Sequence, residues 1–300
     1  MQLIVMHRTT YRFSRPLISA TQLLRLTPSI FLSQTLLDSR IDVNCNAQLR
    51  ESRDGYGNGV HMLYIDEPVQ ELAITATARV ITEDRAGLVE GLPGDLPPEV
   101  FLRPTPLTEP DQSIRQLADN IAAPAKNPLE LLHALNSTLH ERMTFDQSIT
   151  GTGTSAAQSF QAGSGVCQDF AHIFIAAARA RQIPTRYVSG HLFRRDGASI
   201  QEAGHAWAEA WVPELGWVAF DPANGICADD AYVRVAAGLD YLEAAPLAGT
   251  RRGGGTEELS VEVAVTLPPP RSQRQTQRQS QGRGGSAGQS QSQSQIKGDG

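Results

Sequence analysis

Apolar and polar residues alternate along the first 85 residues, and this pattern constrains the fold more than any other feature of the chain. Successive side chains of a strand point to opposite faces, so a period of two predicts a sheet with one buried face. Residues 71–81 (ELAITATARVI) show the pattern best because they are also rich in β-branched side chains. Residues 34–43 and 59–65 are further strand candidates, and the turn-forming run 54–59 (DGYGNG) lies between them. We therefore expect residues 1–85 to form an antiparallel, sandwich-like β-domain.

Helical periodicity begins only after a proline-rich segment. Residues 86–110 contain six prolines, so we expect an extended connection there rather than a regular element. Apolar residues then recur at helical spacing within 111–121 and 127–142. Residues 146–164 are rich in Gly, Ser, Thr and Gln, and this composition predicts a loop.

The segment after this loop predicts an α+β domain. Residues 167–181 are rich in alanine and place aromatic residues on one helical face, and Pro184 ends the helix. Strands are predicted at 185–192, 205–212 and 217–221. A helix followed by antiparallel strands is typical of the α+β class.

The C-terminal part of the chain has weaker signals. We assign residues 111–245 to the core domain and residues 246–268 to a C-terminal strand segment, in which 259–267 (LSVEVAVTL) alternates clearly. The pattern at 232–237 fits either a short helix or a strand. Residues 269–300 are dominated by Gln, Ser, Gly and Arg. Such a composition buries too little apolar area to offset the entropy lost on ordering, so a disordered tail is expected.

Charge and cysteine content exclude several classes of protein. The formal net charge of −6 argues against a broad nucleic-acid-binding surface. The apolar run at Leu3–Met6 is too short for a signal peptide, and no stretch is long enough to cross a membrane. Three widely spaced cysteines without a C-x-x-C pair disfavour a disulfide framework and a structural zinc site. We expect a cytoplasmic protein that binds neither nucleic acid nor membrane.

Cys167 is the first residue of the predicted alanine-rich helix and follows the run Gly163-Ser164-Gly165. Unpaired N–H groups and the helix dipole favour negative charge at a helix N-terminus, and the thiolate is the nucleophilic form of cysteine. The same N–H groups are candidate donors to the oxyanion of a tetrahedral intermediate. Taken alone, the position fits a buried structural cysteine equally well.

His205 and Asp221 lie on neighbouring predicted strands. If Trp211 pairs with Trp217, Asp221 becomes the diagonal neighbour of His205, within reach of a long side chain. A register shifted by one residue would place the two side chains on opposite faces. Separately, His205 fits a half-exposed strand position and Asp221 fits a turn. Together with Cys167 they predict a thiol nucleophile, its base and the carboxylate that orients the base.

Three motifs in this part of the chain resemble those of the transglutaminase-like superfamily. They are G-V-C-Q-D-F-A-H (165–172), G-H-A-W-A-E-A-W (204–211) and G-W-V-A-F-D-P-A-N-G (216–225). The N-terminal part resembles the β-domain that precedes this core in bacterial members, through H-R-T-T-Y-R-F (7–13) and D-G-Y-G-N (54–58).

The resemblance implies a papain-like or transglutaminase-like core, with Cys167 as nucleophile, His205 as base and Asp221 as orienting acid. No cofactor or metal is implied, because the chain has no H-E-x-x-H, Walker or dinucleotide motif. The expected partner is a peptide or protein amide substrate. Hydrolysis is favoured over protein cross-linking because no second site for an amine is evident. Transglutaminase activity and a non-catalytic binding or scaffold protein are the alternatives.

Five other residues near these motifs have structural interpretations. Asp169 lies in the first helical turn, and His172 is expected in helix packing or a supporting hydrogen bond. His191 is interpreted as strand packing, and Trp207 as a core residue or a shield over the thiolate–imidazolium pair. Cys227 is expected to be inert.

Overall fold

The computed structural model describes residues 1–94, 96–146 and 151–269. Contacts between residues divide the chain into two units, Met1–Leu267 and Pro268–Gly300. The first unit holds all of the helices and strands described below. The predicted disordered tail, 269–300, lies outside the described residues except for its first residue.

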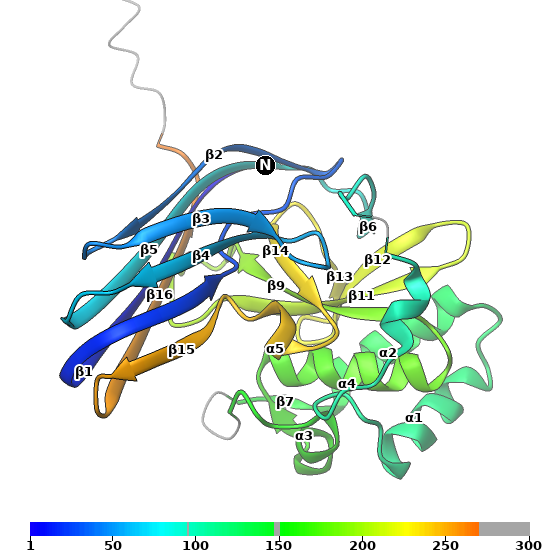
Figure 1. Cartoon of the computed structure of the whole chain (residues 1–300). Coiled ribbons are helices and arrows are strands. Elements are labelled where there is room, and N and C mark those ends of the chain that lie inside the picture. The colour runs from blue at the N-terminus through cyan, green and yellow to red at the C-terminus, as the bar shows by residue number, and fades with distance from the viewer. Residues whose placement is uncertain (95, 147–150, 270–300) are drawn as a thin grey trace, which may run out of the picture. The chain divides into compact units, whose positions relative to one another are not determined.

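An eight-stranded antiparallel sheet combines both ends of this unit. Five of its strands come from the N-terminal region and three from later in the chain (Figure 1). They are β1 (Gln2–Leu24), β2 (Gln34–Val43), β3 (Gln48–Arg53), β4 (Gly59–Ile65), β5 (Val69–Thr82), β10 (Ile200–Gln201), β15 (Leu247–Gly253) and β16 (Glu257–Thr266). The predicted strands at 34–43 and 59–65 are confirmed residue for residue.

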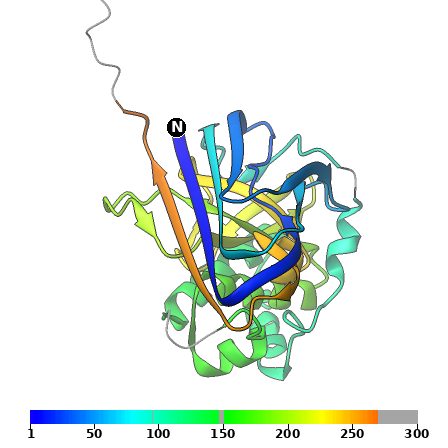
Figure 2. The ribbon, with the colours of Figure 1, turned by 60° about the vertical axis from the view of Figure 1, so that its left-hand side comes forward.

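Strand β1 is shared between two layers of this sheet. Its first half runs between β5 and β16, where Val5 pairs with Ala78 and with Val265, and Figure 2 shows β16 beside β1. Its second half runs between β4 and β15. The pairing with β5 shifts between Arg12 and Leu17, around Pro16, which has no N–H to donate to a ladder. The strand therefore bends there, and the curled sheet encloses a sandwich-like core.

A second antiparallel sheet of six strands forms the centre of the core domain. Its order is β13-β12-β11-β9-β14, and β6 pairs with β12. The strands are β6 (Leu88–Val89), β9 (Thr185–Leu192), β11 (His205–Val212), β12 (Gly216–Asp221), β13 (Ile226–Cys227) and β14 (Tyr232–Gly238). The segment at 232–237, which fitted a helix or a strand in the sequence, is the strand β14.

The helices pack on one face of the six-stranded sheet (Figure 1). They are α1 (Gln112–Ala122), α2 (Pro128–Arg142), α3 (Ala156–Ala162), α4 (Cys167–Ala180) and the short α5 (Tyr241–Ala244). Every residue of α4 from Gln168 to Arg179 is buried. Such a helix must be surrounded by other elements. Helix α4 packs against β11 and β9 on one side and against α1, α2 and α3 on the other.

Two predictions from composition were wrong in part. The described part of the predicted loop 146–164 contains α3, whose start is a capping box: Ser155 accepts the N–H of Gln158, and the Gln158 side chain accepts the N–H of Ser155 at 2.9 Å. The pattern S-x-x-Q was a readable helix signal. The proline-rich connection contains β6 and a 3₁₀ turn at Pro98–Leu102, so it follows the edge of the core sheet.

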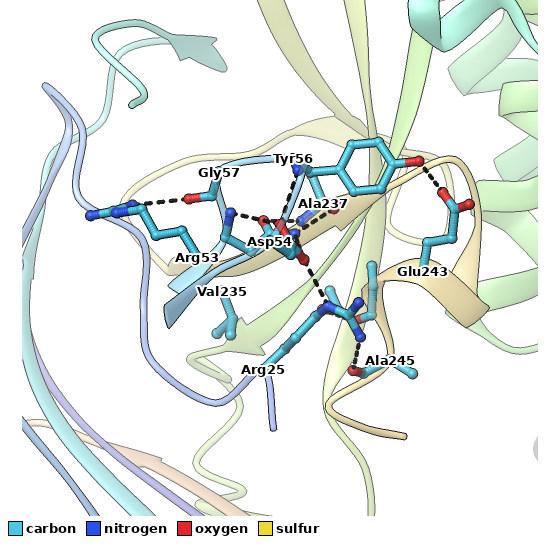
Figure 3. Close-up of polar contacts among 12 residues, drawn as sticks. Arg25, Arg53, Asp54, Tyr56, Gly57, Val235, Ala237, Glu243 and Ala245 are labelled. Atoms are coloured by element: carbon cyan, nitrogen blue, oxygen red, sulfur yellow. Dashed lines mark hydrogen bonds and ion pairs between the residues drawn. The ribbon is translucent and has the colours of Figure 1, made fainter. Parts of the chain in front are cut away.

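The turn-forming run 54–58 fastens the eight-stranded sheet to the core (Figure 3). Asp54 accepts hydrogen bonds from the backbone of Tyr56 and Asn58 and from Arg25 Nε at 3.1 Å. Asn58 exchanges two hydrogen bonds with the backbone of Ala237 in β14, at 2.7 and 2.8 Å. The D-G-Y-G-N motif is thus a docking element between the two sheets.

Candidate active site

Local contacts determine where α4 begins, and so where Cys167 lies. Gly163 ends α3 in the left-handed conformation (φ 71°), and Asp169 accepts the N–H of Val166 at 2.8 Å. A Cβ on Gly165 would lie 2.6 Å from the Asp169 carboxylate, so only glycine leaves room for this cap. Gly165 therefore serves the helix start. Cys167 follows as the first helical residue and is partly exposed.

The first backbone N–H groups of α4 are placed to meet a negatively charged ligand. The hydrogen bonds that begin the helix are donated by Asp169 and Phe170 to the carbonyl of Val166. The N–H groups of Cys167 and Gln168 come before them in the chain, among those that a helix leaves without an intrahelical acceptor. An oxyanion formed next to the Cys167 sulfur would lie beside these donors.

Strands β11 and β12 bring His205 and Asp221 together. The predicted register is confirmed, because Trp211 pairs with Trp217 and Ala208 with Phe220. His205 Nε2 donates to Asp221 Oδ2 at 2.6 Å. Cys167 is the second neighbour of His205, because its side chain, like that of Asp221, raises the pKa of the imidazole. Since Nε2 is engaged by Asp221, the other ring nitrogen, Nδ1, is the one left for the sulfur.

Asp221 is held by four groups besides the histidine. Its Oδ1 accepts the backbone N–H groups of Ala223 at 3.0 Å and Asn224 at 3.2 Å. Its Oδ2 accepts the side-chain amide of Asn224 and the hydroxyl of Tyr232, each at 2.7 Å. Burial alone would raise the pKa of Asp221, but the charge of His205 and these hydrogen bonds lower it below its usual range. The carboxylate therefore stays ionised although it is fully buried.

Sequence reasoning missed Asn224 and Tyr232. Asn224 could have been found, because D-P-A-N is a turn in which Asp221 accepts the next backbone N–H groups. Tyr232 had no such signal, since it reaches Asp221 across the sheet from β14.

The protonated form of His205 is strongly favoured. Burial by itself would lower the pKa of the imidazole. Interactions with Asp221, and then with Cys167, outweigh burial and raise the pKa of His205 to about 10. At neutral pH the imidazole is therefore protonated and paired with the Asp221 carboxylate.

Trp207 covers the histidine from within the sheet. Its ring lies 6.2 Å from the ring of His205 and 5.4 Å from that of Tyr232. A Cβ on Gly190 would meet the indole at 2.6 Å, so glycine at that position makes room for it. The indole is buried and keeps one side of the imidazolium dry, which strengthens its interaction with Asp221.

The remaining candidates lie in structural settings. His172 is fully buried and accepts the N–H of Tyr241 at 3.1 Å, which confirms a supporting role in packing. His191 packs edge-on against His7 of β1, with ring centres 5.5 Å apart, and so joins the two sheets. Burial raises the pKa of the Cys227 thiol, as expected of an unreactive cysteine.

Within residues 1–94, 96–146 and 151–269, no three His, Cys, Asp or Glu side chains gather in a way that could hold a metal ion. None of the helices there is long and apolar enough to cross a membrane.

Two parts of the chain match known protein families. Residues 115–222 match the transglutaminase-like superfamily, and residues 3–81 match the bacterial transglutaminase-like N-terminal region. An uncharacterized protein of Mycobacterium tuberculosis is 32% identical over 287 residues, with 86% of this chain and 91% of the relative covered.

Two named proteins are also similar to this chain. A protein-glutamine gamma-glutamyltransferase of Pseudomonas aeruginosa is 30% identical over 161 residues, which is 47% of this chain but 23% of that protein. The crystal structure of a candidate cysteine protease from Cytophaga hutchinsonii superposes with a TM-score of 0.71 and 24% identity, covering 90% of this chain and 92% of that one. This likeness shows the same fold: an N-terminal β-domain followed by a papain-like core.

Proposed function

Because the chain belongs to the transglutaminase-like superfamily, we propose that it is a cysteine-dependent acyl-transfer enzyme that acts on amide or peptide substrates. In this proposal Cys167 is the nucleophile, His205 the base and acid, and Asp221 the orienting carboxylate. One observation carries it: His205 donates to Asp221 at 2.6 Å, and the neighbouring Cys167 acts together with Asp221 to raise the pKa of the imidazole. A cysteine that only filled space would need no charged partner of this kind.

The reaction follows from this arrangement. The Cys167 thiolate attacks the amide carbonyl carbon, and the new oxyanion accepts hydrogen bonds from the first N–H groups of α4. When the C–N bond breaks, the His205 imidazolium gives its proton to the leaving amine, and a thioester remains. Neutral His205 then takes a proton from water, whose oxygen attacks the thioester. The products are a carboxylic acid and the regenerated thiolate–imidazolium pair.

We infer hydrolysis as the main outcome because water needs no site of its own. Transfer to an amine would need a second site that holds the amine and excludes water. The relative named a protein-glutamine gamma-glutamyltransferase supports glutamine-directed amine transfer as the second candidate. A cytoplasmic location and a peptide or protein substrate stay predictions of the sequence.

One experiment separates these candidates. The protein is incubated with a peptide library that contains glutamine, with and without a primary amine, and cleavage, deamidation and amine incorporation are scored by mass spectrometry. Hydrolysis predicts cleavage or deamidation that the amine does not suppress. Amine incorporation as the main product would favour the transglutaminase alternative. A protein inactive on all substrates, whose Cys167 reacts with iodoacetamide no faster than Cys45 and Cys227, would support the scaffold alternative.

A further inference from the structure

A buried group of three charged side chains lies on the face of the core sheet that α4 does not cover. Glu209 of β11 accepts hydrogen bonds from Arg186 Nε at 2.6 Å and from Arg234 Nε at 2.8 Å. Two guanidinium groups thus share one carboxylate, and the group carries 2 − 1 = +1. Buried charges are normally balanced, because an unbalanced one is costly to remove from water.

Arg186 has unused hydrogen-bonding capacity. Its Nη2 atom is buried and has no hydrogen-bond partner in the described part of the chain, and the residue as a whole is 8% exposed. Arg234 is better satisfied, because its Nη1 also donates to Ser29 Oγ at 2.9 Å. The group with excess positive charge therefore also contains a donor without a hydrogen-bond partner, the Nη2 atom of Arg186.

A cavity of about 430 Å³ opens beside this guanidinium, between the core sheet and the turns of the eight-stranded sheet. Arg186 and Arg234 both line it. The Arg186 guanidinium lies 3.9 Å from the ring centre of Trp217, and Trp211 and Phe101 extend this apolar wall. The volume is within the range of sites for small organic ligands.

We propose that this cavity binds a small organic monocarboxylate with a flat apolar body. The Arg186 guanidinium would attract a carboxylate that enters the cavity, and one negative charge would balance the excess charge of the group. The aromatic wall would hold the apolar body. The lining also includes Arg53, Glu51 and Glu90, whose exposed side chains together carry 1 − 2 = −1 and so oppose a more highly charged anion such as a phosphate ester.

The site is distinct from the candidate active site. Neither Cys167, His205 nor Asp221 lines the cavity. The two sites share strand β11, which carries His205 at its start and Glu209 four residues later. Ligand binding should therefore not depend on the thiol.

The test compares two probes of the same shape, 3-phenylpropanoate and its uncharged amide, 3-phenylpropanamide. Binding to the full chain is measured by titration calorimetry and by quenching of tryptophan fluorescence. We expect the carboxylate to bind roughly tenfold or more tightly than the amide, as for a hydrogen bond to a charged group. Cys167→Ala should bind both probes like the wild type.

Two variants test the location. Leu215→Asp puts a negative charge on a lining residue that is 42% exposed, and it should weaken carboxylate binding by roughly tenfold. Its control, Leu259→Asp, makes the same change at an exposed position of β16 and should have no effect. Arg186→Lys keeps the charge beside Glu209 but removes the planar guanidinium, and it should reduce the preference for carboxylate over amide. Equal affinities for the two probes, no binding of either at millimolar concentration, or binding lost in Cys167→Ala but kept in Leu215→Asp would overturn the proposal.

Discussion

Asp221 and Glu209 are two fully buried carboxylates on neighbouring strands of one sheet, and they do opposite work. Asp221 holds one histidine, whose side chain is 12% exposed and whose pKa also responds to Cys167. Glu209 holds two arginines and is sealed between the sheets. Burial by itself would raise both carboxylate pKa values, and in each case the cationic partners lower the pKa below its usual range.

The difference teaches that the cation decides what a buried carboxylate can do. A guanidinium does not release its proton in a protein, so Glu209 can only fasten strands and orient Arg186. An imidazole can release its proton, so Asp221 can tune a group that takes up and returns one. The same kind of ion pair thus gives a scaffold at Glu209 and, in the function we propose, a proton-transfer site at Asp221.

The largest effect is expected from removing the nucleophile. Cys167→Ala should abolish turnover and change the free energy of unfolding by less than about 1 kcal/mol, because Cys167 is partly exposed. Turnover of a peptide found for the wild type, and thermal unfolding, measure the two quantities. Cys227→Ala is the matched control and should keep activity. Residual activity in Cys167→Ala would remove the thiol from the mechanism.

Asp221→Asn should lower kcat by up to about four orders of magnitude, the loss expected when a triad histidine loses tautomer control. The amide keeps the size of the side chain, so the fold should stay intact by circular dichroism. Asp229→Asn, the same change at a carboxylate that pairs with Arg195, serves as control and should have little effect. If Asp221→Asn left kcat unchanged, Asp221 and Glu209 would not differ in the way that we infer.

Glu209→Gln should act on stability rather than chemistry. It removes the only negative charge of a buried group with two guanidinium groups, and breaking such a pair costs about 3–5 kcal/mol. Denaturant unfolding measures the loss, and Glu258→Gln on the exposed part of β16 is the control. If Glu209→Gln unfolded at the wild-type denaturant midpoint but lost turnover, Glu209 would serve the reaction, as Asp221 does, rather than stability.

The pH dependence should report the raised pKa of His205. The imidazolium must protonate the leaving amine, so kcat/KM should fall as pH rises through about 10, well above the ordinary histidine value of 6.5. Asp221 raises this pKa, so in Asp221→Asn the alkaline limit should move to lower pH. A limit that stays in place would mean that Asp221 does not set the charge of the histidine.

The smallest effect is expected from Tyr232→Phe, which removes one of several hydrogen bonds to Asp221. A single hydrogen bond contributes about 0.5–1.5 kcal/mol, so kcat should fall by no more than about tenfold. The alkaline pH limit of kcat/KM should shift slightly, because Asp221 loses one of the hydrogen bonds that stabilise its negative charge. Tyr64→Phe in β4 is the control. If kcat fell as far as in Asp221→Asn, Tyr232 would be as important for turnover as Asp221.

Local patterns were enough to predict most of the elements that carry the site. The period of two at 185–192 and 205–212 and the helical pattern after Cys167 each arise from contacts between near neighbours in the chain. The register of β11 and β12 was also predictable, because a short turn joins them and Trp211 and Trp217 are natural partners. These features placed His205 near Asp221 and Cys167 at a helix start, whereas the packing of α4 on β11 that brings them together is a long-range contact.

Only the tertiary structure decided what surrounds that group. The last strand that the structure describes, β16, pairs with β1, which lies more than two hundred residues earlier, and no local pattern predicts that pairing. Tyr232 reaches Asp221 from another strand, and the excess charge at Arg186 exists only because β9, β11 and β14 pack side by side. The sequence by itself determines elements and their buried faces, because these depend on periodicity. The partners of a buried charge depend on which distant strands and helices pack together. Only the tertiary structure therefore decides whether such a charge is balanced.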